Sequence, residues 1–108
     1  MYQYSSFDSL GVKIVEGTFS IEYGDTISIS GEWDFEKIGN PENIGPQVGE
    51  GHLIGTIEND DFFAELKPEW IDNNVHLVGI IEGNKISGNW YYSGFAGIIN
   101  DGTFIAEK

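Results

Sequence analysis

Apolar and polar residues alternate along Thr26–Phe35, and this period of two is the strongest constraint on the fold. One side of the segment carries Ile27, Ile29, Gly31, Trp33 and Phe35, and the other carries Thr26, Ser28, Ser30, Glu32 and Asp34. Successive side chains of a β-strand point to opposite faces. The pattern therefore predicts a strand with one face in a core and one in water, as in an antiparallel sheet.

Turn signals separate further segments of this kind, which predicts a series of hairpins. Thr18–Tyr23 leads into Thr26–Phe35 through Gly24-Asp25, Gly51–Glu58 leads into Asp61–Lys67 through Asn59-Asp60, and Asn74–Tyr92 turns around Gly83-Asn84. Tyr2–Phe7 is a weak first strand, and Ile98–Glu107 is a last strand that we expect Asn100-Asp101-Gly102 to bulge or divide.

Seven or eight strands with almost no helical period are typical of an all-β protein. We expect a small antiparallel up-and-down barrel, or a strongly curved sheet or sandwich. The chain has 108 residues, which suits a single domain over residues 1–108.

Two segments do not fit this pattern. Glu36–Glu50 holds two prolines and three glycines, and loops of that length are often lids or binding loops. A solvated excursion or a dimer arm is the plainer interpretation. Pro68–Asn74 is expected to form one helical turn, with Trp70 either plugging the core or facing a ligand.

An internal repeat links the two halves of the chain. Ile29-Ser30-Gly31-Glu32-Trp33 recurs as Ile86-Ser87-Gly88-Asn89-Trp90, and Gly-Thr before an apolar residue occurs at Gly17, Gly55 and Gly102. Each repeat glycine lies on the same face as the tryptophan two residues later. We interpret it as leaving room for a large ring from the neighbouring strand.

The two Gly-x-Trp motifs, Gly31-Glu32-Trp33 and Gly88-Asn89-Trp90, resemble those of the calycins, the group of lipocalins and avidins. This resemblance implies a closed barrel with a ligand site at one mouth. In calycins a late basic residue packs across the tryptophan. The chain has no arginine, so the resemblance implies Lys85 or Lys108 for that role.

The charge balance narrows the classes of partner. Eighteen acidic residues against five lysines give a net charge of -13. Without clustered cations we expect no direct nucleic-acid binding, whereas a basic protein or an amphipathic cation would be attracted. The chain has no cysteine and no long apolar run. Its first residues lack the basic start and apolar core of a signal peptide. We therefore expect a cytoplasmic protein that does not bind membranes.

Few residues suggest catalysis. His52 and His76 could meet across strands and bind a metal with Glu58 or Glu82, but they lack the close spacing of typical metal ligands. Asp60-Asp61 is more typical of a solvated turn than of a calcium-binding loop. The serines of the repeat have no activating partner. The sequence favours a protein without catalytic residues or cofactor, and leaves open an enzyme that uses a pocket carboxylate.

Aromatic residues are the best candidates for a binding site. We expect Trp33, Phe35, Trp90 and Tyr92 to face inward on two corresponding strands, where they either form the core or line a pocket. The first hypothesis is a non-catalytic module that binds a small amphipathic, and by charge a cationic, molecule under a lid formed by Glu36–Glu50. The second is an acidic interaction module that binds a basic partner or forms a homodimer through a sheet edge.

Overall fold

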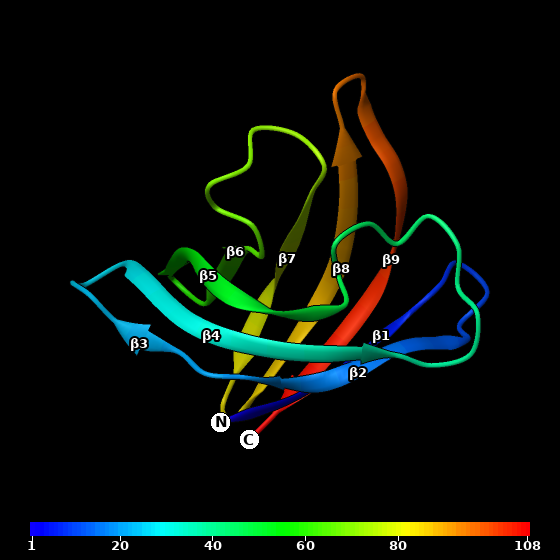
Figure 1. Cartoon of the computed structure of the whole chain (residues 1–108). Helices are drawn as coiled ribbons and strands as arrows, with labels where there is room; N and C mark the ends of the chain where they lie inside the picture. Colours follow the sequence, from blue (N-terminus) through cyan, green and yellow to red (C-terminus); the bar gives the residue numbers. More distant parts are fainter.

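The chain folds into a closed antiparallel β-barrel. A computed structural model describes all residues 1–108 and contains nine strands and no helix (Figure 1). The strands are β1 (Tyr2–Phe7), β2 (Lys13–Phe19), β3 (Glu22–Tyr23), β4 (Ser28–Lys37), β5 (Gly49–Glu58), β6 (Asp61–Glu65), β7 (Asn74–Glu82), β8 (Lys85–Gly94) and β9 (Gly97–Glu107).

Eight of these strands form the barrel wall. The sheet order is β2-β1-β9-β8-β7-β6-β5-β4-β3, and β2 also pairs with β4. The pairing of β2 with β4 closes the sheet on itself, and β3 extends the edge of β4. The expected all-β, single-domain fold is therefore confirmed as a closed up-and-down barrel rather than a sandwich.

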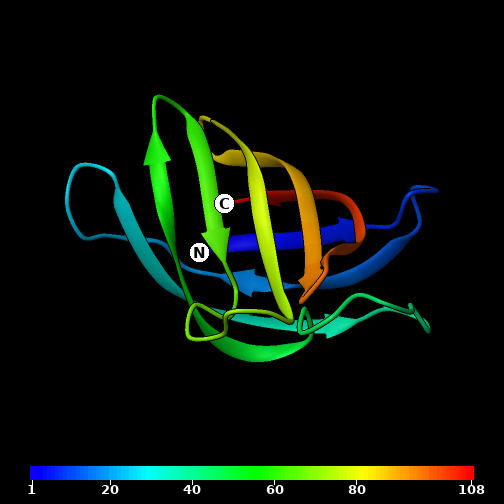
Figure 2. The same ribbon diagram turned by 90° about the horizontal axis from the view of Figure 1, so that it is seen from above.

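The barrel has two different ends. One end, called the loop end, carries the connections 8–12, 38–48, 66–73 and 95–96. The other, called the turn end, carries the tight turns 59–60 and 83–84. The first and last residues of the chain lie near each other there (Figure 1). Figure 2 shows the strands curving around a shared interior.

Two hairpins form where their turn residues predicted them. Asn59 and Asp60 both adopt positive φ angles, of 51° and 71°, between β5 and β6. Gly83 has a φ of 61° between β7 and β8. Such left-handed backbone matches the twist of a two-residue hairpin, which explains why these sequence signals were reliable.

The expected strand Thr18–Tyr23 does pair with β4, but it is interrupted at Ser20 and Ile21. The strand β2 starts earlier, at Lys13, and ends at Phe19, and only Glu22 and Tyr23 pair again, as β3. Tyr23 is exposed rather than buried. The chain stays beside β4 across the interruption, because β2 and β3 pair with β4 in one register and the Ser20 N–H donates a 2.9 Å hydrogen bond to the Glu32 carbonyl. What ends at Phe19 is the pairing of β2 with β1.

Asp25 holds the turn that follows β3. One carboxylate oxygen of Asp25 accepts hydrogen bonds from the backbone N–H groups of Ser28, at 2.6 Å, and Ile27, at 2.8 Å. These bonds favour the charged carboxylate and lower the pKa of Asp25 below its usual value.

Three other expectations are corrected in detail. The strands β4 and β5 extend into the predicted loop Glu36–Glu50, so the loop, called here the lid loop, is residues 38–48. The segment Pro68–Asn74 contains no helical turn, only a turn closed by the Trp70 N–H and the Lys67 carbonyl. The strand β9 is undivided, and its irregularity lies opposite Tyr92 and Ser93, at Ile99 rather than at 100–102.

The repeat glycines allow backbones to approach, rather than making room for a ring. A Cβ atom at Gly31 would collide with the carbonyl oxygen of Ser20, and one at Gly88 with that of Val78. The glycines of the three Gly-Thr pairs likewise face carbonyl oxygens of Asp34, Phe63 and Phe7. These positions mark close strand contacts in a small, strongly curved wall.

Aromatic side chains fill the interior. The Tyr4 ring stacks on Phe35 with centroids 4.1 Å apart, and Phe19 and Phe104 lie around it at 6.2 and 5.8 Å. Nineteen buried apolar residues form one core cluster. The barrel is therefore packed by its own side chains.

Candidate functional site

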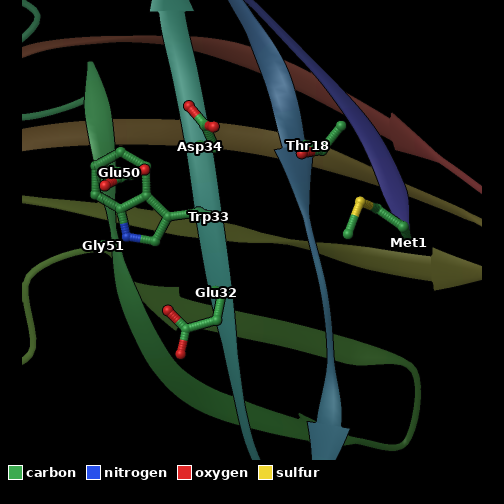
Figure 3. Close-up of a pocket in the computed structure, with 7 residues that line it drawn as sticks. All are labelled: Met1, Thr18, Glu32, Trp33, Asp34, Glu50 and Gly51. Carbon is green, nitrogen blue, oxygen red and sulfur yellow. The ribbon is translucent and has the colours of Figure 1, made fainter.

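The largest hollow lies on the outer wall, over β2, β4 and β5 (Figure 3). Its volume is about 580 Å³, and its lining residues are Met1, Thr18, Glu32, Trp33, Asp34, Glu50 and Gly51. Thr18, Asp34 and Glu50 stand directly opposite one another on the three strands. The carboxylates of Asp34 and Glu50 repel each other across the two strands. A cation bound near them would relieve this repulsion.

Trp33 borders this hollow but is itself buried in the interior. Its side chain is 2% exposed, because Glu32 and Asp34 on either side of it point outward. The indole lies beside Gly51 on β5 (Figure 3), where an added Cβ would be 3.0 Å from the ring. Its Nε1 donates a hydrogen bond of 3.0 Å to the Leu66 carbonyl.

A lysine does pack across this tryptophan, but not one that the calycin resemblance suggested. The Nζ atom of Lys67 lies 5.4 Å from the Trp33 ring centroid and 5.2 Å from that of Trp70. Lys67 follows β6 at the loop end, where Trp33 lies. Lys85 and Lys108 are at the turn end, and Lys108 instead covers Tyr2, at 5.4 Å.

Trp90 repeats the arrangement of Trp33 on the opposite part of the barrel. It is fully buried, stands opposite Gly102 on β9, and donates a 2.9 Å hydrogen bond from Nε1 to the Phe7 carbonyl. The internal repeat thus builds two matched units, each with an indole over a glycine of the next strand and a bond to a carbonyl at the loop end.

Tyr92 joins two loops at the loop end. Its ring packs against Gly45 of the lid loop, where a Cβ atom would collide with it, and Gly45 has a φ of 62°. Its hydroxyl donates a 2.7 Å hydrogen bond to Asn73 Oδ1 in the connection 66–73. The lid loop is also tied by the Asn100 side chain, which donates to the Glu42 carbonyl at 3.4 Å.

Gln47 inserts the lid loop into the barrel. Its side chain is fully buried, and its Oε1 accepts hydrogen bonds from the Tyr4 hydroxyl at 2.8 Å and the Ser6 hydroxyl at 2.6 Å. Its Nε2 has no hydrogen-bond partner. Ile44 of the same loop is also buried. The lid loop therefore plugs the loop end with one apolar and one polar side chain.

Burial keeps the Tyr4 hydroxyl protonated. Desolvation raises the pKa of Tyr4 well above its usual value, and the hydrogen bond with Ser6 offsets only part of this rise. The hydroxyl is therefore a permanent donor at physiological pH.

This cluster was not predicted from the sequence. The alternation in Tyr2–Phe7 already places Tyr4 and Ser6 on one inward face, two residues apart, which was the available signal. No signal marked Gln47, because its burial depends on the path of the lid loop. Of the four predicted residues, Trp33, Phe35 and Trp90 are buried in the core, where Phe35 stacks on Tyr4. Tyr92 is partly buried and contacts the lid loop.

The histidines do not come together. His52 Nδ1 lies 3.3 Å from a Glu32 carboxylate oxygen, and His76 Nε2 lies 3.2 Å from one of Glu65. Each histidine thus pairs with a carboxylate of a neighbouring strand, and not with Glu58 or Glu82. No group of three or more histidine or carboxylate side chains is arranged to hold a metal ion.

The chain matches no protein-family model, no curated protein and no solved structure. No helix with the length and apolar character required to cross a lipid bilayer is present.

Proposed function

We propose that this protein is a non-catalytic binding protein for a small amphipathic molecule, which enters at the loop end in the space that Ile44 and Gln47 fill when the lid loop is closed. The observation that carries the proposal is the convergence of two hydroxyls on one oxygen atom inside an aromatic interior. In the closed state that oxygen comes from the protein's own Gln47.

The two hydroxyls form a donor clamp. Tyr4 and Ser6 point inward from the same strand, and both donate to the Gln47 amide oxygen. A ligand with a carbonyl or ether oxygen on a flat apolar body would satisfy both donors and stack near Phe35. A buried carboxylate would add charge to an acidic protein, so a neutral oxygen acceptor suits the site better.

Gln47 fits the clamp only in part. The Gln47 amide carries an NH₂ donor group as well as its acceptor oxygen. The oxygen is bonded by both hydroxyls, but the Nε2 donor has no hydrogen-bond partner. A buried unsatisfied donor costs about 1–3 kcal/mol. Withdrawal of Gln47 into water removes this cost, and a ligand that carries an acceptor without a donor avoids it. The closed lid loop is therefore a displaceable occupant of the site.

The four aromatic residues take different roles in this proposal. Movement of the lid loop would uncover Tyr92, which contacts Gly45, and a ligand bound to the Tyr4 hydroxyl would lie near Phe35, on which the Tyr4 ring stacks. Trp33 and Trp90 would form the deeper wall and report binding by fluorescence. A cationic group on the ligand would be favoured by the net charge of -13.

A calycin-type relationship is part of the same proposal. It is supported by the closed antiparallel barrel, by the two Gly-x-Trp motifs and by Lys67 across the Trp33 ring. A chain without cysteine suits a reducing compartment, so we propose the cytoplasm as its place of action.

Titration with the fluorescent naphthalene ketone Prodan tests the proposal, with 2-dimethylaminonaphthalene as a matched probe that lacks the carbonyl. We expect saturable binding of Prodan that is weakened about tenfold by Ser6→Ala, the loss of one buried hydrogen bond to the ligand. Ser5→Ala, on the outward face of the same strand, is the control and should not change binding. Equal binding of both probes, or equal effects of both serine variants, would overturn the proposal.

A further inference from the structure

Exposed apolar side chains gather at the loop end. The set called here the apolar crown consists of Trp70, Ile71, Phe95, Ile98 and Ile99. Ile71 and Phe95 are 104% and 94% exposed. A contiguous exposed apolar patch on a protein commonly marks an interaction site.

The apolar crown belongs to two neighbouring connections. Asn74, Ser93 and Ile98 stand opposite one another on β7, β8 and β9. The connection 66–73 therefore enters the sheet beside the base of the β8–β9 tip, and the Tyr92–Asn73 hydrogen bond ties the two together. The tip extends beyond the rest of the barrel (Figure 1), and Phe95 at its end is almost fully exposed.

Carboxylates adjoin the residues of the apolar crown in the sequence. Glu69 and Asp72 flank Trp70 and Ile71 in sequence, and Asp101 follows the β8–β9 tip. The tip itself, residues 93–100, carries no charge. The only lysine of the connection 66–73 is Lys67, whose Nζ lies over the Trp33 and Trp70 rings. Glu69, Asp72 and Asp101 are all exposed and are called here the acidic rim.

We propose that the apolar crown docks a cationic amphipathic segment of a partner protein. Apolar side chains of the partner would pack on Phe95 and Ile71, and its lysines or arginines would meet the acidic rim. An anionic lipid surface would be repelled by a protein of charge -13. A second copy of the chain would bring an equally acidic rim, so charge also disfavours self-association through this surface. The surface is separate from the Tyr4–Ser6 clamp.

A synthetic amphipathic helix of leucine and lysine is the probe, and a scrambled peptide of the same composition is its control. Isothermal titration should show binding of the amphipathic peptide that weakens about tenfold in Phe95→Ser/Ile98→Ser, the loss expected for two central contacts. The matched variant is Val78→Ser/Ile80→Ser, because these residues are also apolar and exposed but lie on the outer wall. It should bind as the unchanged protein does.

The acidic rim is tested in the same way. The double variant Glu69→Gln/Asp72→Asn should bind the peptide more weakly, and with a smaller dependence on salt, than the unchanged protein. The control Glu58→Gln/Asp61→Asn, at the turn end, should show smaller changes in both quantities. Absence of peptide binding, equal binding of the scrambled peptide, or equal losses in crown and wall variants would overturn the proposal. So would binding of phosphatidylcholine or phosphatidylserine vesicles through Phe95, or sedimentation showing a dimer that Phe95→Ser/Ile98→Ser dissolves. Ser6→Ala should leave peptide binding unchanged, which separates this proposal from the clamp.

Discussion

The hydroxyl of Tyr4 donates a 2.8 Å hydrogen bond to the amide oxygen of Gln47, 43 residues away in the chain and inside the barrel. This bond connects the first strand of the wall to the lid loop. The position of the loop therefore depends on a hydrogen bond inside an apolar interior. In such surroundings the bond is strong, and the loss of either partner leaves the other without a hydrogen bond at a high cost in free energy.

Replacement of Gln47 should loosen the lid loop and lower stability. Gln47→Ala leaves the hydroxyls of Tyr4 and Ser6 without their acceptor, and we expect a loss of about 1–3 kcal/mol in the free energy of unfolding. Urea unfolding measures the loss. Gln3→Ala, on the exposed face of β1, is the control and should stay within about 0.5 kcal/mol of the unchanged protein. Equal stability of both variants would show that Gln47 does not hold the lid loop.

The close backbone contacts predict a sharp difference among glycines. In Gly102→Ala the new methyl group would collide with the Phe7 carbonyl and lie 2.6 Å from Trp90 Nε1. We expect a loss of about 1–3 kcal/mol from overpacking, seen as a lower thermal midpoint. Gly24→Ala is the matched variant, because its nearest neighbour would be 3.7 Å away and its φ is not positive. A Gly102→Ala protein as stable as Gly24→Ala would contradict the proposed packing.

Lys67 should contribute to the packing of the loop end. Its Nζ lies close to the rings of Trp33 and Trp70, so Lys67→Gln should cost about 0.5–1 kcal/mol and alter tryptophan fluorescence. Lys85→Gln, at the other end of the barrel, serves as the comparison. The cation–ring contact has no role if the two variants have the same stability and emission spectrum.

Stability should fall in alkaline solution because of Tyr4. Its pKa is raised in the folded protein, whereas in the unfolded chain a tyrosine titrates near about 10. Above that pH the folded state holds a proton that the unfolded state has lost, so stability that is complete below pH ~10 declines by about 1.4 kcal/mol per pH unit as pH rises toward the folded pKa.

Unfolding curves of the unchanged protein and of Tyr4→Phe over this pH range isolate the Tyr4 contribution, since the other titrating groups are common to both. The difference in their free energies of unfolding should shift with pH in favour of Tyr4→Phe. Parallel curves would show that Tyr4 is not held protonated. Tyr23→Phe, at an exposed site, should run parallel to the unchanged protein.

Asp25 should make stability depend on pH in the opposite direction to Tyr4. Its pKa is lowered in the folded protein by the backbone bonds at Ser28 and Ile27, so its contribution is present above the unfolded value of about 3.9 and is lost as pH falls through the folded pKa. Asp25→Ala should therefore show a weaker loss of stability in acid than the unchanged protein. Identical acid profiles would exclude a role for this turn.

Much of the fold was predictable from local signals. Alternation along Thr26–Phe35 and the turns at 59–60 and 83–84 depend only on neighbouring residues, and they gave strands and hairpins close to those observed. The end of β2 at Phe19 was not predictable, because it coincides with the end of its pairing with β1, which no local signal marks.

The candidate site was only partly predictable for the same reason. The period of two could place Tyr4, Ser6 and Phe35 inward, but a plug by Gln47 depends on the three-dimensional path of a loop without periodicity. Lys67 was missed because its contact with Trp33 joins the end of β6 to β4, which no sequence motif marks.

Hydrogen–deuterium exchange of residues 38–48, with and without saturating Prodan, tests the displacement of the lid loop most directly. If the ligand takes the place of Ile44 and Gln47, exchange in the lid loop becomes faster when Prodan binds, while exchange in β1 becomes slower. Lid-loop exchange that stays unchanged or slows on binding would contradict the account.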